Sequence, residues 1–260
     1  MRSVELFAGA GGLAIGMANS GFNHAAIVEW NRDACETFRE NHNGENWPVI
    51  EGDVRQFDYG HLKDVVVVSG GPPCQPFSLG GKHKGYLDEP DMFPEAVRAV
   101  RELRPKAFIF ENVKGLMRET FSEYFEYILM QLQHPGLKRK GTDESWQDHR
   151  SRLERHQTSR GAKAEYNVLF RLLNAAKYGV PQRRERVFFV GLRSDLGIEW
   201  TSPRRHIPKM HCYIPNGSPV SIGIVMRFRC ANDQLSIPDK LPESRDFALK
   251  VQTYFTKHRG

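Results

Sequence analysis

A cysteine on a turn of glycines and prolines is the residue best suited to covalent chemistry in this chain. The apolar run Val65–Val68 predicts a buried strand, and Gly70-Gly71-Pro72-Pro73-Cys74 follows it. Glycines let the backbone approach a ligand closely, and prolines fix the path of the loop. Open α/β sheets place their chemistry at the carboxyl ends of parallel strands, so Cys74 is a candidate nucleophile. The alternative is a structural turn with a half-buried thiol.

A carboxylate follows another predicted strand. Glu111 comes directly after the apolar run Ala107–Phe110, so we expect it at the same sheet edge as Cys74. There it could protonate or hydrogen-bond a substrate nitrogen. Its alternative role is to begin the helix expected from about Leu116 to Leu132, because acidic residues often occupy helix N-termini.

Two guanidinium groups lie in a third segment. Strands are predicted at Tyr166–Phe170 and Arg186–Gly191, and the connection between them contains Gln182-Arg183-Arg184-Glu185-Arg186. A short connection of this kind can carry Arg184 and Arg186 into a site. A cluster of surface salt bridges is the alternative.

A glycine-rich turn near the N-terminus predicts a cofactor site. Ser3–Phe7 indicates a strand, Gly9-Ala10-Gly11-Gly12 follows, and Leu13–Ala18 has a helical pattern. The glycines admit a ligand against bare backbone, and the helix N-terminus offers free N–H groups to a nucleotide-type cofactor. Similar turns also occur in βαβ units that bind no cofactor.

Two acidic residues near the next strand ends strengthen the cofactor interpretation. Glu29 follows the apolar run Ala25–Val28 and is placed to accept hydrogen bonds from ribose hydroxyls, unless it begins the next helix. Asp53 lies just past a short strand predicted within residues 49–54. Trp30 could cover an adenine ring or fill a gap in the core.

The order of these elements predicts an α/β protein with a parallel sheet. Further helices are expected at residues 31–41 and 92–103. The glycine-rich, basic residues 80–91 are typical of a loop that closes on a substrate. Residues 136–163 form a polar insertion, partly helical near 145–156, whose basic side chains favour a solvated face over a nucleic-acid contact.

The composition is that of a globular protein, with 40% hydrophobic and 26% charged residues in a chain of 260. No apolar run is long enough to span a membrane, and no signal peptide is recognised. The four cysteines have no paired spacing, which argues against disulfides or zinc and favours a reducing cytosol. The net charge of +6 resides in residues 201–260, with 10 basic and 4 acidic residues, and a basic balance suits a nucleic-acid partner.

Four segments, in this order, resemble the motifs of the DNA (cytosine-5)-methyltransferases. They are Glu5–Gly12, Gly71–Gln75, Glu111–Val113 and Gln182–Arg186. The resemblance covers about residues 1–200 and points to the bacterial type II restriction–modification enzymes. It implies an S-adenosylmethionine-dependent methyltransferase (Rossmann-like) fold, with a mostly parallel seven-stranded sheet, a terminal reversed hairpin and helices on both faces. It also implies S-adenosyl-L-methionine as cofactor and double-stranded DNA as partner.

The resemblance assigns a role to each matching residue. Cys74 would be the nucleophile, Glu111 the acid at the cytosine ring nitrogen, and Arg184 and Arg186 the cations that position the substrate. Cofactor binding is implied for Phe7, Ala8, Gly9, Gly11 and Gly12 at the methionine end, Glu29 at the ribose, Trp30, Asp53 and Val54 at the adenine, and Pro73 and Met92 in the same pocket. Substrate binding is implied for Gln75, Ser78, Asn112 and Val113. No metal and no membrane are implied.

The chemistry of cytosine methylation explains these residue types. Cytosine C5 is too weak a nucleophile to accept a methyl group unaided, and addition of a thiolate to C6 makes C5 nucleophilic. A hydrogen bond from Glu111 to N3 makes this addition easier. Because a base in a duplex cannot reach such a pocket, it must be flipped out, which costs a few kcal/mol.

Residues 201–260 do not resemble the remaining parts of the family. Where the family continues with a target recognition region and a final motif, this basic tail shows neither, so residues 1–200 are interpreted as the catalytic domain. Three explanations fit: a split enzyme whose complementary subunit carries the recognition region, a truncated chain, or a reading frame that shifts soon after Trp200.

The main functional hypothesis is DNA cytosine-5 methylation in the bacterial cytoplasm, with the protein associated with the nucleoid when on DNA. The alternatives are an RNA cytosine-5 methyltransferase of the same fold and a catalytically silent DNA-binding remnant or subunit. Amino-group methyltransferases are disfavoured, because they typically place an aromatic residue after two prolines, where this chain has Cys74.

Overall fold

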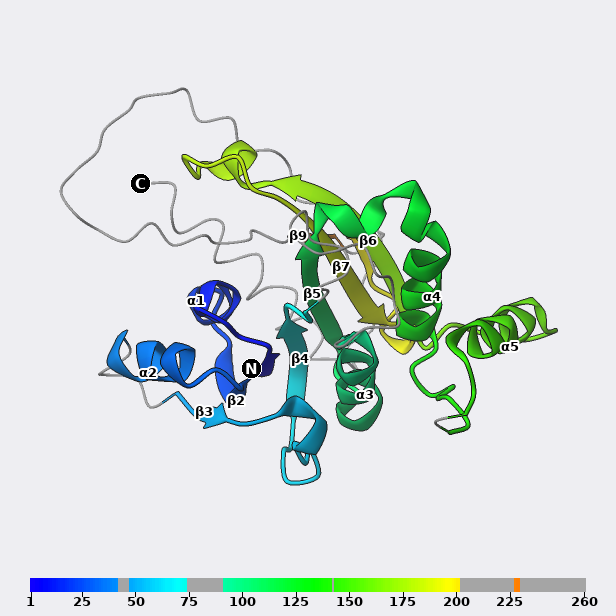
Figure 1. Cartoon of the computed structure of the whole chain (residues 1–260), viewed down its shortest axis with the longest axis horizontal. Coiled ribbons are helices and arrows are strands. Elements are labelled where there is room, and N and C mark those ends of the chain that lie inside the picture. The colour runs from blue at the N-terminus through cyan, green and yellow to red at the C-terminus, as the bar shows by residue number, and fades with distance from the viewer. Residues whose placement is uncertain (42–46, 74–90, 142, 202–226, 230–260) are drawn as a thin grey trace, which may run out of the picture.

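The computed structural model describes residues 1–41, 47–73, 91–141, 143–201 and 227–229. Its centre is a seven-stranded sheet in the order β3-β2-β1-β4-β5-β7-β6 (Figure 1). The strands are β1 (Arg2–Leu6), β2 (Asn23–Glu29), β3 (Val49–Glu51), β4 (Val65–Gly70), β5 (Ala107–Val113), β6 (Tyr166–Asn174) and β7 (Glu185–Arg193). Within this sheet β7 runs antiparallel to both its neighbours, which confirms the mostly parallel sheet with a reversed hairpin.

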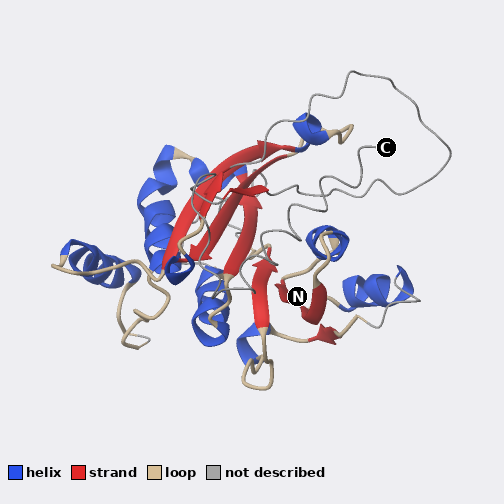
Figure 2. Cartoon of the chain, turned by 180° about the vertical axis from the view of Figure 1, so that it is seen from behind, coloured by secondary structure: helices blue, strands red, loops and turns tan. Residues whose placement is uncertain are grey.

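Helices lie on both faces of the sheet, as the views from the two sides show (Figures 1 and 2). They are α1 (Gly12–Asn19), α2 (Arg32–Asn41), α3 (Phe93–Leu103), α4 (Ser122–Gln133) and α5 (Trp146–Thr158). The alternation of β7 separates the two faces: Val187 and Phe189 join the core under α3 and α4, whereas Phe188 and Val190 pack on the side of α1.

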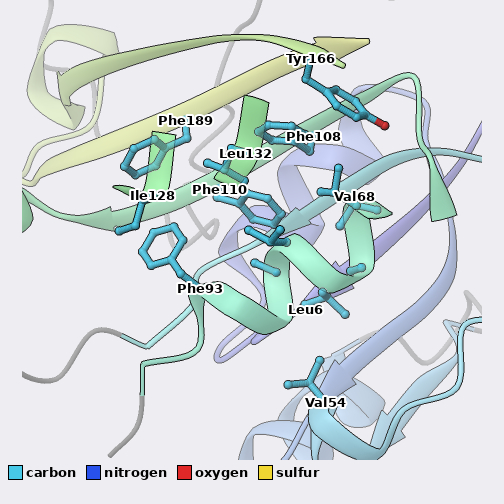
Figure 3. Packing of buried hydrophobic residues seen from close by; sticks show 14 of the residues in the cluster. Leu6, Val54, Val68, Phe93, Phe108, Phe110, Ile128, Leu132, Tyr166 and Phe189 are labelled. Carbon is cyan, nitrogen blue, oxygen red and sulfur yellow. The ribbon is translucent and has the colours of Figure 1, made fainter. Parts of the chain in front are cut away.

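The main core lies between the sheet and helices α3 and α4 (Figure 3). Phe93, Phe108, Phe110 and Phe189 are completely buried there. The rings of Phe108 and Phe110 stack at 5.2 Å, and those of Phe93 and Phe189 meet edge to face at 5.6 Å. Aromatic pairs of this geometry add about 0.5–1.5 kcal/mol each beyond their buried area. The core therefore holds β4, β5 and β7 rigidly below the edge of the sheet where the predicted site lies.

Strand β5 is longer than its apolar run. It continues through Glu111 to Val113, because β7 pairs with it along its whole length and places Val113 opposite Arg186. Glu111 therefore lies inside a strand and not after one, and the expectation that a helix starts near Leu116 is wrong. Two short 3-10 turns, η4 (Lys114–Met117) and η5 (Glu119–Phe121), precede α4.

Strand β3 is short, and Asp53 lies just past its end, as predicted. It ends at Glu51, and Val54 begins a 3-10 turn, η1 (Val54–Gln56). The Asp53 carboxylate caps this turn by accepting a hydrogen bond from Arg55 N at 2.9 Å. Asp and Asn compete with strand pairing in this way, because their side chains bond to nearby backbone N–H groups.

The polar insertion forms α5, with Ser145 as its N-cap. Two of its arginines are paired within the protein: Arg150 pairs with glutamates of α4 and α5, and Arg152 bonds to Glu144 at 2.9 Å. Such pairing agrees with a solvated charged face. Strands β8 (Glu199–Thr201) and β9 (Arg227–Arg229) form a separate antiparallel pair. The rest of the predicted tail lies outside the described residues, as does most of the predicted closing loop, so the domain boundary at residue 200 stays a prediction.

Candidate active site

A cavity of about 530 Å³ opens where β1, β4 and β6 end and β7 begins. Its lining joins four segments that are far apart in the sequence. These are Glu5, Phe7, Ala8, Gly9, Ala10, Gly12 and Leu13; Gly71; Glu111; and Leu173, Ala175, Tyr178, Val180, Gln182, Arg184, Arg186 and Phe188. The glycine turn, the loop that leads to Cys74, the acid and the arginines therefore meet at one site, as the sequence predicted.

Glu111 and Arg186 form the charged pair of the cavity. Arg186 Nε lies 2.9 Å from Glu111 Oε1, and both side chains are about one-quarter exposed. Burial raises the pKa of Glu111 above its ordinary value, while the guanidinium groups of Arg186 and Arg184 oppose this rise. The result is a carboxyl group that holds its proton more readily than an exposed glutamate does. That property suits an acid that donates to a ring nitrogen.

The glycine turn is open on its cavity side. A Cβ atom built on Gly9 or Gly12 would meet no atom within 4 Å. Gly9 and Gly11 both have positive φ angles, of 53° and 84°, but only at Gly11 would a Cβ atom lie 2.6 Å from the Phe38 ring. The turn thus favours glycine at both Gly9 and Gly11, and packing against Phe38 constrains only Gly11, whereas Gly9 and Gly12 leave bare backbone for a ligand. Phe7 also has a positive φ of 53°, a rare conformation for a side chain of this size.

Glu29 connects the end of β2 to the glycine turn. Its Oε2 accepts a hydrogen bond from Gly9 N at 2.7 Å, and its Oε1 accepts one from Asn31 N at 2.8 Å. The next residue, Trp30, is 73% exposed, so its ring is free to cover a planar ligand. The open glycine backbone, the Glu29 carboxylate and the exposed Trp30 ring suit S-adenosylmethionine. Each Glu29 oxygen already accepts one backbone hydrogen bond.

Seven predicted cofactor residues are not part of the cavity lining: Gly11, Glu29, Trp30, Pro73, Asp53, Val54 and Met92. Asp53 is held by Arg55, whose Nη2 lies 2.6 Å from Asp53 Oδ2. The Val54 side chain is buried in the core (Figure 3), so a contact from Val54 to a ligand would have to use its backbone. Met92 precedes α3 and packs against the same core.

The turn before Cys74 is fixed by a buried amide. Asn112 is 4% exposed, and its Nδ2 donates a hydrogen bond to Pro72 O at 2.9 Å. Val113, the other substrate residue predicted in this motif, is half-buried and packs against the main core. Pro73 is exposed, and Cys74, Gln75 and Ser78 lie outside the described residues. The structure therefore shows how β5 holds the start of the Cys74 loop.

Glu5 is a functional candidate that the sequence alone did not single out. It is completely buried at the wall of the cavity and accepts a hydrogen bond from the Ser69 hydroxyl. Burial raises its pKa to about 8, and the bond from Ser69 opposes this rise. The signal was an acidic residue inside an apolar strand. Tyr178 and Val180 also line the cavity without having been predicted.

Two classes of site are not found in the described parts of the chain. No group of three His, Cys, Asp or Glu side chains there could hold a metal ion. None of the helices there is long and apolar enough to cross a bilayer.

The sheet order and the glycine turn define the S-adenosylmethionine-dependent methyltransferase fold. A solved E. coli prophage protein, described as a DNA modification methyltransferase, superposes with a TM-score of 0.55 at 25% identity, covering 78% of this chain and 49% of its own. A Spodoptera frugiperda DNMT2 variant superposes with a TM-score of 0.51 at 21% identity, covering 86% of this chain and 56% of its own.

The family follows from the sequence comparisons. The model of the C-5 cytosine-specific DNA methylases matches residues 1–140 and 147–249, and this chain belongs to that family. The type II methyltransferase M.NgoMIV of Neisseria gonorrhoeae is 38% identical over 209 residues, which are 80% of this chain and 57% of that protein. M.AquIA of Picosynechococcus is 36% identical over 211 residues, which are 78% of this chain and 76% of that protein.

The chain spans about half the length of most curated relatives that it matches. It covers 57% of M.NgoMIV and 40% of M.PspPI from Psychrobacter. The similarity also reaches into residues 201–260, the segment that was expected not to resemble the family. The match to M.HgiCII of Herpetosiphon aurantiacus covers 98% of this chain at 34% identity, and the family model extends to residue 249.

Proposed function

We propose that this chain transfers a methyl group from S-adenosylmethionine to C5 of a flipped-out cytosine in double-stranded DNA, as part of a restriction–modification system in a bacterial cytoplasm. One observation carries the proposal: a single cavity joins the open glycine turn to the Glu111–Arg186 pair, and Gly71 in its wall leads directly to Cys74. The family membership and the names of the relatives support the same reaction.

The described residues suit the cofactor. The open backbone of Gly9 and Gly12 and the buried carboxyl of Glu5 would face its methionine end, and Glu29 and the exposed Trp30 ring would face its nucleoside end. Bound S-adenosylmethionine supplies an electrophilic methyl group. Leu13 and Phe7 give the cavity an apolar wall, which limits the access of water to the reacting atoms.

The reaction itself would be carried by Cys74 and Glu111. The Cys74 thiolate adds to cytosine C6 while Glu111 donates a hydrogen bond to N3, so that electron density moves to C5. After C5 takes the methyl group, solvent accepts the C5 proton, the electron pair of the C5–H bond forms the C5–C6 double bond, and Cys74 leaves C6 as a thiolate. Arg184 and Arg186 line the same cavity and supply positive charge, which favours the thiolate over the thiol.

We further propose that the chain acts together with a target recognition region supplied by another polypeptide or by additional chain. The chain covers only about half of most relatives, and target reading requires residues beyond the cavity described above. M.AquIA is closer to this chain in length, because the match covers 76% of M.AquIA.

Trapping with 5-fluorocytosine DNA tests this function. Fluorine at C5 blocks the loss of the proton, so a competent enzyme with cofactor should form a stable covalent adduct that disappears in Cys74→Ala. The experiment is done with the chain alone and with a recognition region from a relative added. Adduct in either arm supports the reaction, and adduct only in the second arm supports a split enzyme. Folded protein that binds cofactor but forms no adduct in either arm would contradict it, and adduct on RNA in place of DNA would favour the RNA alternative.

A further inference from the structure

The tip of the β6–β7 hairpin has two different faces. The residues at its tip alternate between them: Leu173, Ala175, Tyr178, Arg184 and Arg186 line the active-site cavity. Asn174, Ala176, Lys177, Arg183 and Glu185 line a second hollow, of about 460 Å³. Strand geometry explains this division where β6 ends and β7 begins, because successive strand side chains point to opposite faces: Leu173 and Arg186 face the cavity, and Asn174 and Glu185 face away from it. The motif Gln182–Arg186 therefore sends two arginines into the cavity and Arg183 away from it.

The hairpin tip has a defined conformation. Asn174 stands opposite Glu185 in the register, and Asn174 Oδ1 accepts a hydrogen bond from Ala176 N at 3.1 Å. Ala175 N donates to Arg184 O at 2.9 Å, and Gly179, with φ of 89°, ends the 3-10 turn at Tyr178. The hairpin extends beyond the rest of the sheet (Figure 1), and the side chains of Lys177 and Arg183 at its tip are exposed.

The second hollow has an excess of positive charge. Lys177 and Arg183 are exposed at its lining. The Lys114 ammonium group, from the turn after β5, lies 2.9 Å from Glu185 Oε2. The hydrogen bond from Lys114 lowers the pKa of Glu185, and the charges of Lys177 and Arg183 act in the same direction. Three cations thus surround one carboxylate, which leaves the hollow able to attract a further anion.

We propose that this face of the hairpin tip, formed by Lys177, Arg183 and Lys114, binds the phosphate backbone of the DNA strand whose cytosine enters the cavity. The inference rests on the proposed function. A flipped cytosine that reaches Glu111 and Arg186 leaves its strand lying across the cavity rim, and the hairpin tip is part of that rim. Lysine and arginine at a rim contact phosphates, which fixes the register of the strand without reading its sequence.

The salt dependence of DNA binding tests this surface. The variant Lys177→Gln/Arg183→Gln keeps the side-chain stems and removes two charges. The control Arg155→Gln/Lys163→Gln removes two exposed charges from the insertion, so the net charge of the two variants is the same. Binding of a fluorescent random-sequence duplex is measured by anisotropy over a range of NaCl concentrations. Each phosphate contact contributes about 0.9 to the slope of log K against log salt, so the hairpin variant should lose about 1.8 and the control nothing.

Glu185→Gln provides an independent arm. Removal of the Glu185 carboxylate should tighten duplex binding several-fold if a phosphate binds in the hollow, and should not change it otherwise. Equal slopes in the hairpin variant and the control, or no duplex binding by the unchanged chain at the lowest salt, would overturn the proposal. Adduct formation with 5-fluorocytosine DNA is measured in parallel. A changed slope without adduct contradicts the catalytic proposal alone, and adduct with an unchanged slope contradicts the phosphate surface alone.

Discussion

Arg186 Nε and Glu111 Oε1 lie 2.9 Å apart because of the register between β5 and β7. Arg186 is directly opposite Val113, and Glu111 is opposite Phe188, so the two charged side chains are diagonal neighbours on one face. Burial and the guanidinium group act on the pKa of Glu111 in opposite directions, and burial is the stronger effect. An antiparallel strand in an otherwise parallel sheet thus brings the cation to the acid.

The substitution Glu111→Gln should separate hydrogen bonding from proton donation. The glutamine amide keeps a donor for the cytosine ring nitrogen but holds no proton to transfer, so we expect the rate of adduct formation to fall by at least about 100-fold. Single-turnover adduct formation with 5-fluorocytosine DNA measures this. Arg193→Gln serves as the control, because Arg193 is on β7 outside the cavity lining and pairs with Asp195. A Glu111→Gln enzyme at the full rate would remove Glu111 from the mechanism.

Two adjacent glycines should respond differently to substitution. Gly11→Ala places a methyl group against Phe38 at a positive φ, so it should destabilise the fold by about 1–3 kcal/mol. Gly12→Val meets no protein atom within 4 Å of its Cβ, so it should leave stability nearly unchanged while weakening S-adenosylmethionine binding at least about tenfold. Urea unfolding and calorimetric titration of the cofactor measure the two effects. Equal loss of stability in both variants would show that Gly12 is not a ligand-facing position.

Much of the fold was predictable, because most helices and strands have a characteristic pattern of residues in their own segment of sequence. The apolar runs of β4 and β5 and the period of α3 identify buried elements directly, and the glycine turn marks the first βα unit. The extension of β5 through Glu111 was not predictable in this way. The charged Glu111 interrupts the apolar pattern that identifies a strand. It belongs to β5 because it pairs with β7, which is far away in the sequence.

The residues that could carry the chemistry were predictable from their types, but the contacts that hold them in place were not. The motifs indicated Glu111 and both arginines, and the structure brings all three to one cavity. The same motifs gave no sign that Asn112 holds the Pro72 carbonyl or that Gly11 is constrained by Phe38. Such roles depend on contacts between segments, which spacing along a sequence does not reveal.

Replacing Asn112 with Leu should loosen the start of the Cys74 loop. The Pro72 carbonyl would lose its donor in a buried position, at a cost of about 1–3 kcal/mol in the free energy of unfolding. We also expect slower adduct formation, because the loop that carries Cys74 would lose an anchor to β5. Urea denaturation and single-turnover trapping measure the two effects. Asn167→Leu, at an exposed position on β6, is the matched control. If both variants have the same stability, the Asn112–Pro72 bond does not anchor the loop.

The pH dependence of stability should depend on Glu5. Burial raises the pKa of Glu5 from an ordinary 4.5 to about 8, so between these pH values the folded protein holds a proton that the unfolded chain has released. The contribution of Glu5 therefore lowers the free energy of unfolding as the pH rises from about 4.5 to about 8, by about 1.4 kcal/mol per pH unit, and changes little above that range. Glu5→Gln cannot ionise and should remove this slope. Urea denaturation of both proteins at pH 5, 6, 7 and 8 measures the difference, with Glu95→Gln on α3 as the control. Parallel curves for Glu5→Gln and the unchanged protein would mean that Glu5 is ionised in the folded state at neutral pH.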